Sequence, residues 1–331
     1  MDTIVLNSPV DMHLHLRDGA MLQAVAPETA RQFAGAVVMP NLKPPVDSLD
    51  KLLAYRERIM AAVGDAAFEP FMTLFLRDYS EEELLAAREH IIGVKLYPEG
   101  VTTNSDTGLP NVEAAESTYA RMEALGIPLL VHGETHGFSM DREREFVAVY
   151  DYLASKFPQL KIIMEHITTV EAAEFLGQHE NVFATITLHH LSLTLDDLLG
   201  GSLQPHLFCK PIVKTPQDRE AILKLALEAH PRVMFGSDSA PHPLSAKTGE
   251  TCAAGVFSAP LLLPALAELF EQHGALDKLP AFVCDNARRI YDIQPAEKTV
   301  TLKKAPMTVP EMVGEVRPWR DGQTLNWSLA D

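Results

Sequence analysis

A regular alternation of apolar runs and helical patterns constrains the fold of this chain more than any other feature of its sequence. The runs are rich in β-branched residues and cover 10–14, 35–41, 68–76, 91–97, 127–133, 161–167, 182–187 and 232–238. Helical patterns between them cover 49–63, 80–90, 112–125, 142–157, 169–178 and 215–229. Near-continuous apolar strands separated by helices are typical of a parallel sheet covered on both faces. Eight such units predict an α/β fold, an eight-stranded parallel β/α (TIM-type) barrel.

A doubly wound open sheet is the alternative, but it would more often carry a glycine-rich phosphate loop after its first strand, and the sequence has none. After the last run, a long loop at 239–258 precedes two further helical stretches and a tail rich in proline and charge. We expect one domain over residues 1–331, with the barrel strands within about 10–238 and the C-terminal helices and tail at 259–331 as a short appendage.

The composition limits the classes of function. The chain has 331 residues, of which 47% are hydrophobic, and a formal net charge of −17. This charge argues against binding to nucleic acid or to anionic membranes, and any site for an anion must be locally positive. The cysteines Cys209, Cys252 and Cys284 form no Cys-x-x-Cys pair. With no signal-peptide pattern and no membrane-spanning run, we expect a cytoplasmic protein.

Metal-ligating side chains follow the first barrel strand. The apolar run from Ile4 to Val10 predicts an entering strand, after which His13 and His15 would lie on the same face. Two imidazoles on one face form half of a metal site, and Arg17 beside them would suit an anionic substrate. Because His-x-His alone is a weak signal, two partly buried histidines with hydrogen-bond partners are the alternative.

Three other predicted strands also end in metal-ligating residues. His132, His166 and Asp238 end the fifth, sixth and eighth runs. The active site of a β/α barrel lies at the carboxyl ends of its strands, so these side chains would meet His13 and His15.

Lys95 interrupts the apolar fourth run. A buried ammonium is costly unless it is paired or neutralised. A salt bridge to an acid such as Asp238 would explain it, and so would snorkelling of the side chain to the strand end. A neutral buried amine can also add carbon dioxide to become a carbamate, an anion with two oxygens that can bridge two divalent cations.

Taken together, these residues resemble those of the amidohydrolase superfamily. The set is His13, His15, Arg17, Asn41, Lys95, His132, His166, Asp238 and His242. The segments around them, such as 11–18, 38–42, 93–98, 130–134 and 236–242, are most similar to the dihydroorotases, in the shorter, self-standing class of bacteria and fungi. The resemblance covers most of the chain, including the order and spacing of the barrel strands.

The resemblance implies an enzyme that reversibly hydrolyses the cyclic amide of (S)-dihydroorotate to N-carbamoyl-L-aspartate, the third step of pyrimidine (UMP) biosynthesis. It implies two divalent metals, most commonly zinc, bridged by a carboxylated Lys95 (N6-carboxylysine) and a hydroxide, in a homodimer. The more buried metal would be held by His13, His15, Lys95 and Asp238, and the more exposed metal by Lys95, His132 and His166.

The resemblance also implies the substrate contacts. Arg17, Asn41 and His242 would bind the substrate carboxylate, backbone groups near Lys210 and Ala254 would meet the ring amides, and the hydroxyls of Thr102 and Thr103 would reach the substrate. The threonines belong to loop 98–111, which would act as a lid, although its composition fits a solvated turn equally well. Asp238 would transfer the proton to the departing nitrogen.

Two other functions stay open. A hydantoinase- or allantoinase-type cyclic amidase could use the same barrel, and an inactive barrel could act as a partner subunit. Against the latter, every predicted ligand position is occupied. We expect His189 and His190, after the seventh run, to lie outside the metal site, and neither Cys209 nor Cys252 has a base in the sequence pattern to activate it.

Overall fold

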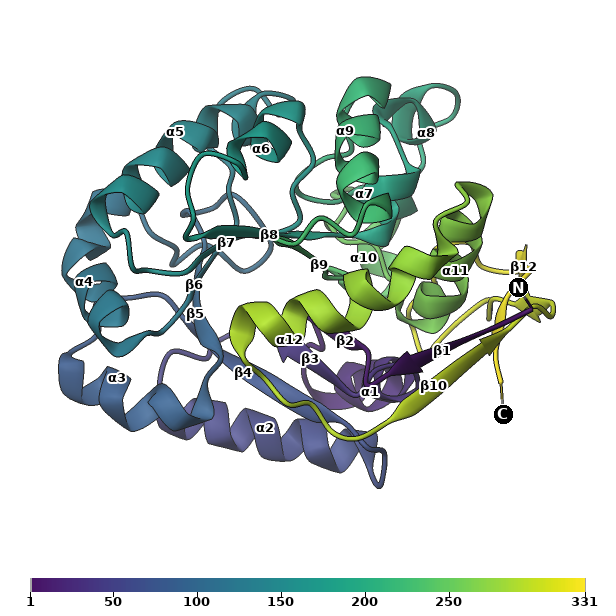
Figure 1. The fold of residues 1–331 in the computed structure, drawn as a ribbon, viewed down its shortest axis with the longest axis horizontal. Coiled ribbons are helices and arrows are strands. Elements are labelled where there is room, and N and C mark those ends of the chain that lie inside the picture. Colours follow the sequence, from purple (N-terminus) through teal and green to yellow (C-terminus); the bar gives the residue numbers. More distant parts are fainter. Residues whose placement is uncertain (1, 331) are drawn as a thin grey trace.

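An eight-stranded parallel sheet organises the molecule, and helices surround it (Figure 1). The computed structural model describes residues 2–330. The strands follow one another around the sheet in chain order: β2 (Val10–Leu14), β3 (Gly35–Val38), β4 (Glu69–Phe75), β5 (Gly93–Leu96), β6 (Leu129–Val131), β7 (Ile162–Met164), β8 (Val182–Ile186) and β9 (Val233–Phe235). A parallel bridge between Leu14 and Ser239 joins the first strand end to the last. The predicted barrel is confirmed, with each strand at a predicted run.

The helices lie between the strands and after them. The α-helices are α1 (Gly19–Gln32), α2 (Leu49–Val63), α3 (Glu81–Ala87), α4 (Glu116–Leu125), α5 (Arg142–Lys156), α6 (Val170–Phe175), α7 (Leu188–Ser192), α8 (Leu195–Leu199), α9 (Pro216–Leu227), α10 (Leu244–Lys247), α11 (Leu262–Gln272) and α12 (Asn286–Tyr291). Short 3₁₀ turns occur at η1 (Arg88–His90), η2 (Val112–Ala115), η3 (Pro205–Leu207), η4 (Ala259–Leu261) and η5 (Leu276–Lys278), and a π turn at η6 (Ala281–Asp285). Among the described residues, no helix is long and apolar enough to cross a membrane.

Local side-chain chemistry fixes several helix starts. At α3 the Ser80 hydroxyl accepts from the Glu83 N–H, and the Glu83 carboxylate accepts from the Ser80 N–H, which is a capping box. At α9 Thr215 caps the helix and Pro216 occupies its first turn, where a missing N–H costs nothing.

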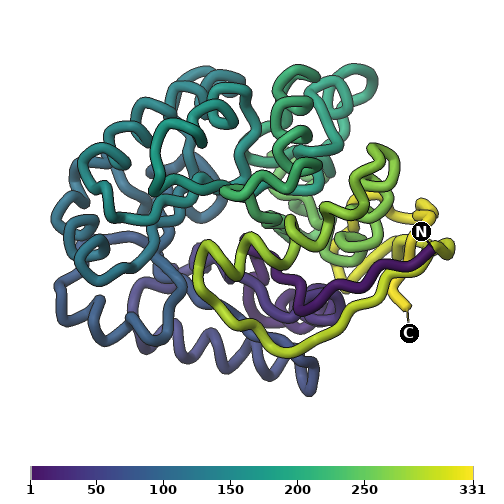
Figure 2. Tube along the Cα trace, in the orientation of Figure 1, coloured from purple at the N-terminus to yellow at the C-terminus, as the bar shows by residue number. Residues whose placement is uncertain are grey.

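The N-terminal segment differs from the prediction of one entering strand over 4–10. Ser8 has a left-handed φ of 48°, and it separates β2 from an earlier strand, β1 (Thr3–Asn7). β1 pairs antiparallel with β10 (Thr299–Lys303), which also pairs with β13 (Ser328–Leu329). A smaller ladder joins β11 (Met307–Thr308) to β12 (Thr324–Leu325). Figure 2 shows both ends of the chain at the same edge of the molecule.

Apolar side chains fill the barrel below the site. Val10, Met12, Leu130, Ile163 and Met234, from four strands, belong to one cluster, as expected of inward-facing barrel residues. On β2 the pairing register shifts between Asp11 and Leu14. Met12 therefore belongs to this inner cluster, whereas Leu14 and Leu16 belong to the outer core.

Candidate active site

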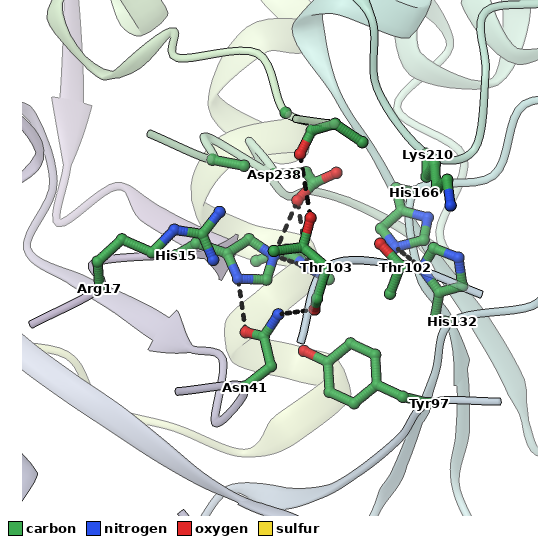
Figure 3. A pocket seen from close by; sticks show the side chains of 14 residues that line it. His15, Arg17, Asn41, Tyr97, Thr102, Thr103, His132, His166, Lys210 and Asp238 are labelled. Atoms are coloured by element: carbon green, nitrogen blue, oxygen red, sulfur yellow. Dashed lines mark hydrogen bonds and ion pairs between the residues drawn. The ribbon is translucent and has the colours of Figure 1, made fainter. Parts of the chain in front are cut away.

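A polar cavity lies at the carboxyl ends of the barrel strands (Figure 3). Most of the predicted site residues line it: His13, His15, Arg17, Asn41, Thr102, Thr103, His132, His166, Lys210, Asp238 and Ala254. They lie within or just after β2, β3, β6, β7 and β9, and in the loops that follow β5, η3 and α10. Apart from His13, which belongs to β2, these side chains lie beyond the strand ends. Asn41, His132, His166 and Asp238 still fall within the longer apolar runs that predicted the strands.

Three side chains converge at one side of the cavity floor. His13 Nε2 lies 3.3 Å from His15 Nε2. Asp238 Oδ1 lies 3.0 Å from His15 Nε2 and 3.5 Å from His13 Nε2. Two ligands bound tetrahedrally at about 2.0–2.1 Å from a zinc ion lie about 3.3 Å apart. The spacing of these atoms therefore fits a common divalent cation.

A second pair of histidines lies beside this group. His132 Nδ1 is 3.2 Å from His166 Nε2, again the spacing of two ligands on one ion. The His13 and His166 ring centroids are 4.9 Å apart, so the two groups adjoin.

Lys95 does not line the cavity and is fully buried, with 0% exposure. Its Nζ has no hydrogen-bond partner among residues 2–330, and burial lowers its pKa to about 8. Snorkelling to water is therefore wrong for this side chain, and no ion pair with Asp238 is formed within the described chain. An unpartnered, readily neutral amine next to both ligand groups fits the donor set of a two-metal site with a carboxylated lysine.

Carboxylates and an amide fix the other ring nitrogens of three histidines. Glu165 Oε2 lies 2.7 Å from His13 Nδ1, and Glu134 Oε2 lies 2.7 Å from His132 Nε2. Asn41 Oδ1 lies 2.9 Å from His15 Nδ1. Such partners orient metal-binding imidazoles and set their tautomer. Burial lowers the pKa of His15 and His166 well below the usual value, so these rings are in the neutral form that binds metals.

Three residues of the site have unusual backbone geometry. Arg17, His166 and Asp238 have positive φ values of 59°, 43° and 43°. Each such non-glycine residue costs about 1–3 kcal/mol, and this strain persists where the surrounding structure fixes it, often at functional sites. The strain directs these side chains to the cavity from positions just beyond the strands.

Arg17 provides a cationic end of the cavity. Its Nε donates to the Pro241 carbonyl at 3.1 Å, and its Nη2 lies 3.1 Å from His242 Nε2. His242 Nε2 also lies 2.9 Å from the Ala254 carbonyl. His242 does not line the cavity. In this structure it contacts the Arg17 guanidinium, which does line the cavity.

Hydrogen bonds connect loop 98–111 to residues on two sides of the cavity. On one side, Asn41 Nδ2 donates to the Thr103 carbonyl at 3.0 Å. On the other, Thr103 Oγ1 lies 3.3 Å from the Ala254 carbonyl, and Lys210 Nζ donates to the Val101 carbonyl at 2.6 Å. Both threonines line the cavity, so the solvated-turn alternative does not describe this conformation.

A second group of residues of metal-ligating types does not line the cavity. His189, His190 and Cys209 are buried together. However, His190 Nδ1 pairs with Thr187 Oγ1 and its Nε2 donates to the Pro211 carbonyl, both at 2.9 Å. These bonds within the chain occupy both ring nitrogens of His190, so the group offers no preformed metal site.

Sequence reasoning missed several residues of the site. Tyr97, Ala240 and Gly255 line the cavity, and Glu134 and Glu165 orient histidines. Both glutamates adjoin a strand-end histidine, as His132-Gly-Glu134 and Glu165-His166. That proximity was a usable signal, because ligating histidines commonly donate to carboxylates.

Comparison with known proteins agrees with this geometry. Residues 10–293 match the amidohydrolase family. The dihydroorotase of Helicobacter hepaticus is 44% identical over 340 residues, covering 99% of this chain and 98% of that protein. The crystal structure of the Campylobacter jejuni dihydroorotase superposes with a TM-score of 0.95 at 49% identity, over 99% of this chain and 98% of that one.

A more distant relative also matches over its full length. The dihydroorotase of Saccharomyces cerevisiae, solved in complex with 5-fluoroorotic acid, has a TM-score of 0.93 at 33% identity, over 100% of this chain and 99% of that chain. The barrel and its cluster of His and Asp side chains thus define an amidohydrolase. Within that superfamily, the chain belongs to the dihydroorotase family.

Proposed function

We propose that this enzyme reversibly hydrolyses the cyclic amide of (S)-dihydroorotate to N-carbamoyl-L-aspartate with two divalent metal ions bound at the cavity of Figure 3. The observation that supports this most is a buried, unpartnered Lys95 amine whose charge acts on His13 of one ligand group and His166 of the other. Arg17 lines the cavity together with both groups.

The ligand assignment follows from the spacings. His13, His15, Asp238 and a carboxylated Lys95 would hold one metal, and Lys95, His132 and His166 the other, zinc being the ion that imidazole and carboxylate ligands suit. When bound, the two cations would lower the pKa of the attacking water and would polarise the scissile carbonyl.

The protein side chains bind the substrate and move the proton. Arg17 and Asn41 would bind the ring carboxylate, with His242 holding Arg17 in place, and Thr102 and Thr103 would enclose the ring with backbone groups of Lys210 and Ala254. As water adds to the carbonyl carbon and the carbon–nitrogen bond breaks, Asp238 would take the proton from the water and deliver it to the departing nitrogen.

Two broader expectations are part of the proposal. The chain would act as one domain, because the tail strand β10 pairs with β1 next to the barrel. It would work as a homodimer in the cytoplasm, in pyrimidine synthesis, as its family resemblance implies.

The direct test is hydrolysis of dihydroorotate by the purified, zinc-loaded protein, with N-carbamoyl-aspartate measured by chromatography. Dihydrouracil and hydantoin serve as competing substrates, because they lack the ring carboxylate. Efficient, chelator-sensitive hydrolysis of dihydroorotate supports the proposal. Faster hydrolysis of the uncharged rings would favour a general cyclic amidase, and a metal-loaded protein without activity on any of them would favour the inactive barrel.

A further inference from the structure

Tyr97 places an unused hydroxyl in the cavity. It follows β5, two residues after Lys95, and lines the cavity. Its side chain is buried, with the residue 2% exposed, and its hydroxyl has no hydrogen-bond partner within the described chain. In Figure 3 this hydroxyl points toward Asn41 and Thr103.

The position of the hydroxyl is fixed by packing of the Tyr97 ring, because the hydroxyl itself forms no hydrogen bond within the described chain. The Tyr97 ring stacks on Phe75 with centroids 5.2 Å apart and on His132 with centroids 6.4 Å apart. A rigid ring with a fixed donor is preorganised for a ligand, since little freedom is lost when the ligand binds.

The remaining buried tyrosines show what is unusual about this one. Tyr55 donates its hydroxyl to the Arg17 carbonyl and Tyr79 donates to the Phe75 carbonyl, each at 2.7 Å. Within residues 2–330, the hydroxyls of Tyr119 and Tyr291 also lack partners, but neither residue lines the cavity. A buried polar group without a partner destabilises the folded state. Of the three unpartnered tyrosine hydroxyls in the described chain, that of Tyr97 is the one that a ligand in the cavity can reach.

We propose that Tyr97 is a further substrate-binding residue, whose hydroxyl donates a hydrogen bond to an oxygen of bound dihydroorotate or N-carbamoyl-aspartate. Both molecules carry several carbonyl or carboxylate oxygens as acceptors. The cavity already offers cationic donors at Arg17, and Tyr97 adds a neutral donor between that end and the ligand groups. This inference rests on the proposed function.

The test compares Tyr97→Phe with Tyr119→Phe. Both variants remove one buried, unpartnered hydroxyl, but Tyr119 is remote from the cavity and packs on Phe157. We expect Tyr97→Phe to lower kcat/KM for dihydroorotate about tenfold, as for the loss of one hydrogen bond to a ligand, with metal content unchanged. Its melting temperature without substrate should be equal to or above that of the wild type, because an unsatisfied group is removed. Tyr119→Phe should keep wild-type kinetics.

Several results would overturn the inference. One is a Tyr97→Phe variant that retains kcat/KM within about twofold of the wild type. Another is loss of metal from this variant, which would mean that the hydroxyl binds the modified Lys95 side chain and not the substrate. A wild-type crystal with bound dihydroorotate gives a second measurement that needs no variant: no substrate oxygen within hydrogen-bond distance of Tyr97 Oη also refutes it. Failure of the proposed function is distinguishable, because the wild type itself would then not hydrolyse dihydroorotate.

Discussion

Replacement of Arg17 by glutamine should remove the preference for a carboxylated ring. At most two of the five N–H groups of a guanidinium are engaged within the protein, by the Pro241 carbonyl and His242. The others are available to a substrate carboxylate at the cavity. The −17 charge of the whole chain gives no general attraction for an anion, so this local contact has to supply it.

The expected magnitude follows from the type of contact. A hydrogen bond to a charged group contributes about 1.5–3 kcal/mol, which corresponds to a factor of roughly 10 to 150 in kcat/KM. The assay measures kcat/KM for dihydroorotate and for dihydrouracil in the wild type and in Arg17→Gln, together with zinc content. The ratio of the two substrates should fall by that factor, with metal unchanged.

Two control variants sharpen the experiment. Arg17→Lys keeps the charge without the planar fork and should give an intermediate preference. Arg58→Gln removes a nearby cation that pairs with Asp18 on the surface and should leave the preference unchanged. If Arg17→Gln retains the wild-type preference, the carboxylate does not bind where we place it.

Four further predictions address the metals, the proton and the loop. Lys95→Ala should lose metal and most activity, and short carboxylic acids should partly restore both; an active, metal-loaded Lys95→Ala would contradict carboxylation. Asp238→Asn should fold normally yet turn over about 10²- to 10⁴-fold more slowly, and normal turnover with metals bound would exclude the proton transfer. Because burial lowers the pKa of Lys95 to about 8, the neutral amine that adds carbon dioxide increases as pH rises through that value. Zinc uptake by metal-free enzyme at fixed dissolved carbon dioxide should therefore increase from about pH 7 to pH 9, and a decrease would refute this cause. Lys210→Met removes the bond to the Val101 carbonyl and should speed amide hydrogen exchange in loop 98–111, with unchanged exchange showing that Lys210 does not fasten the loop.

The barrel could be predicted from the sequence because its strands are buried on both faces. Such strands are near-continuous apolar runs, and residues that interrupt or end those runs, such as Lys95 and His132, stand out. The clustering of ligands at one end then followed from the parallel topology.

Other features depended on long-range or conformational information. β1 pairs with β10, far away in the chain. The turn-forming residues Asn7, Ser8 and Pro9 within the run 4–10 were a signal for its division that the prediction of one strand did not use. Helix α1 was missed, since it begins at a glycine and contains Pro27, which obscure a helical pattern. The hydroxyl of Tyr97 could not be assigned either, because a tyrosine at the end of an apolar strand is typical of the core, and its direction depends on the packing of Phe75 and His132.

The central claim is that two metals and a carboxylated Lys95 form the catalytic centre, and an anomalous-scattering map of active enzyme at the zinc edge tests it most directly. We predict two peaks, one among His13, His15 and Asp238 and one between His132 and His166, with electron density extending from Lys95 Nζ to both. A fully active enzyme with a single peak, or with density that ends at the amine, would contradict the account.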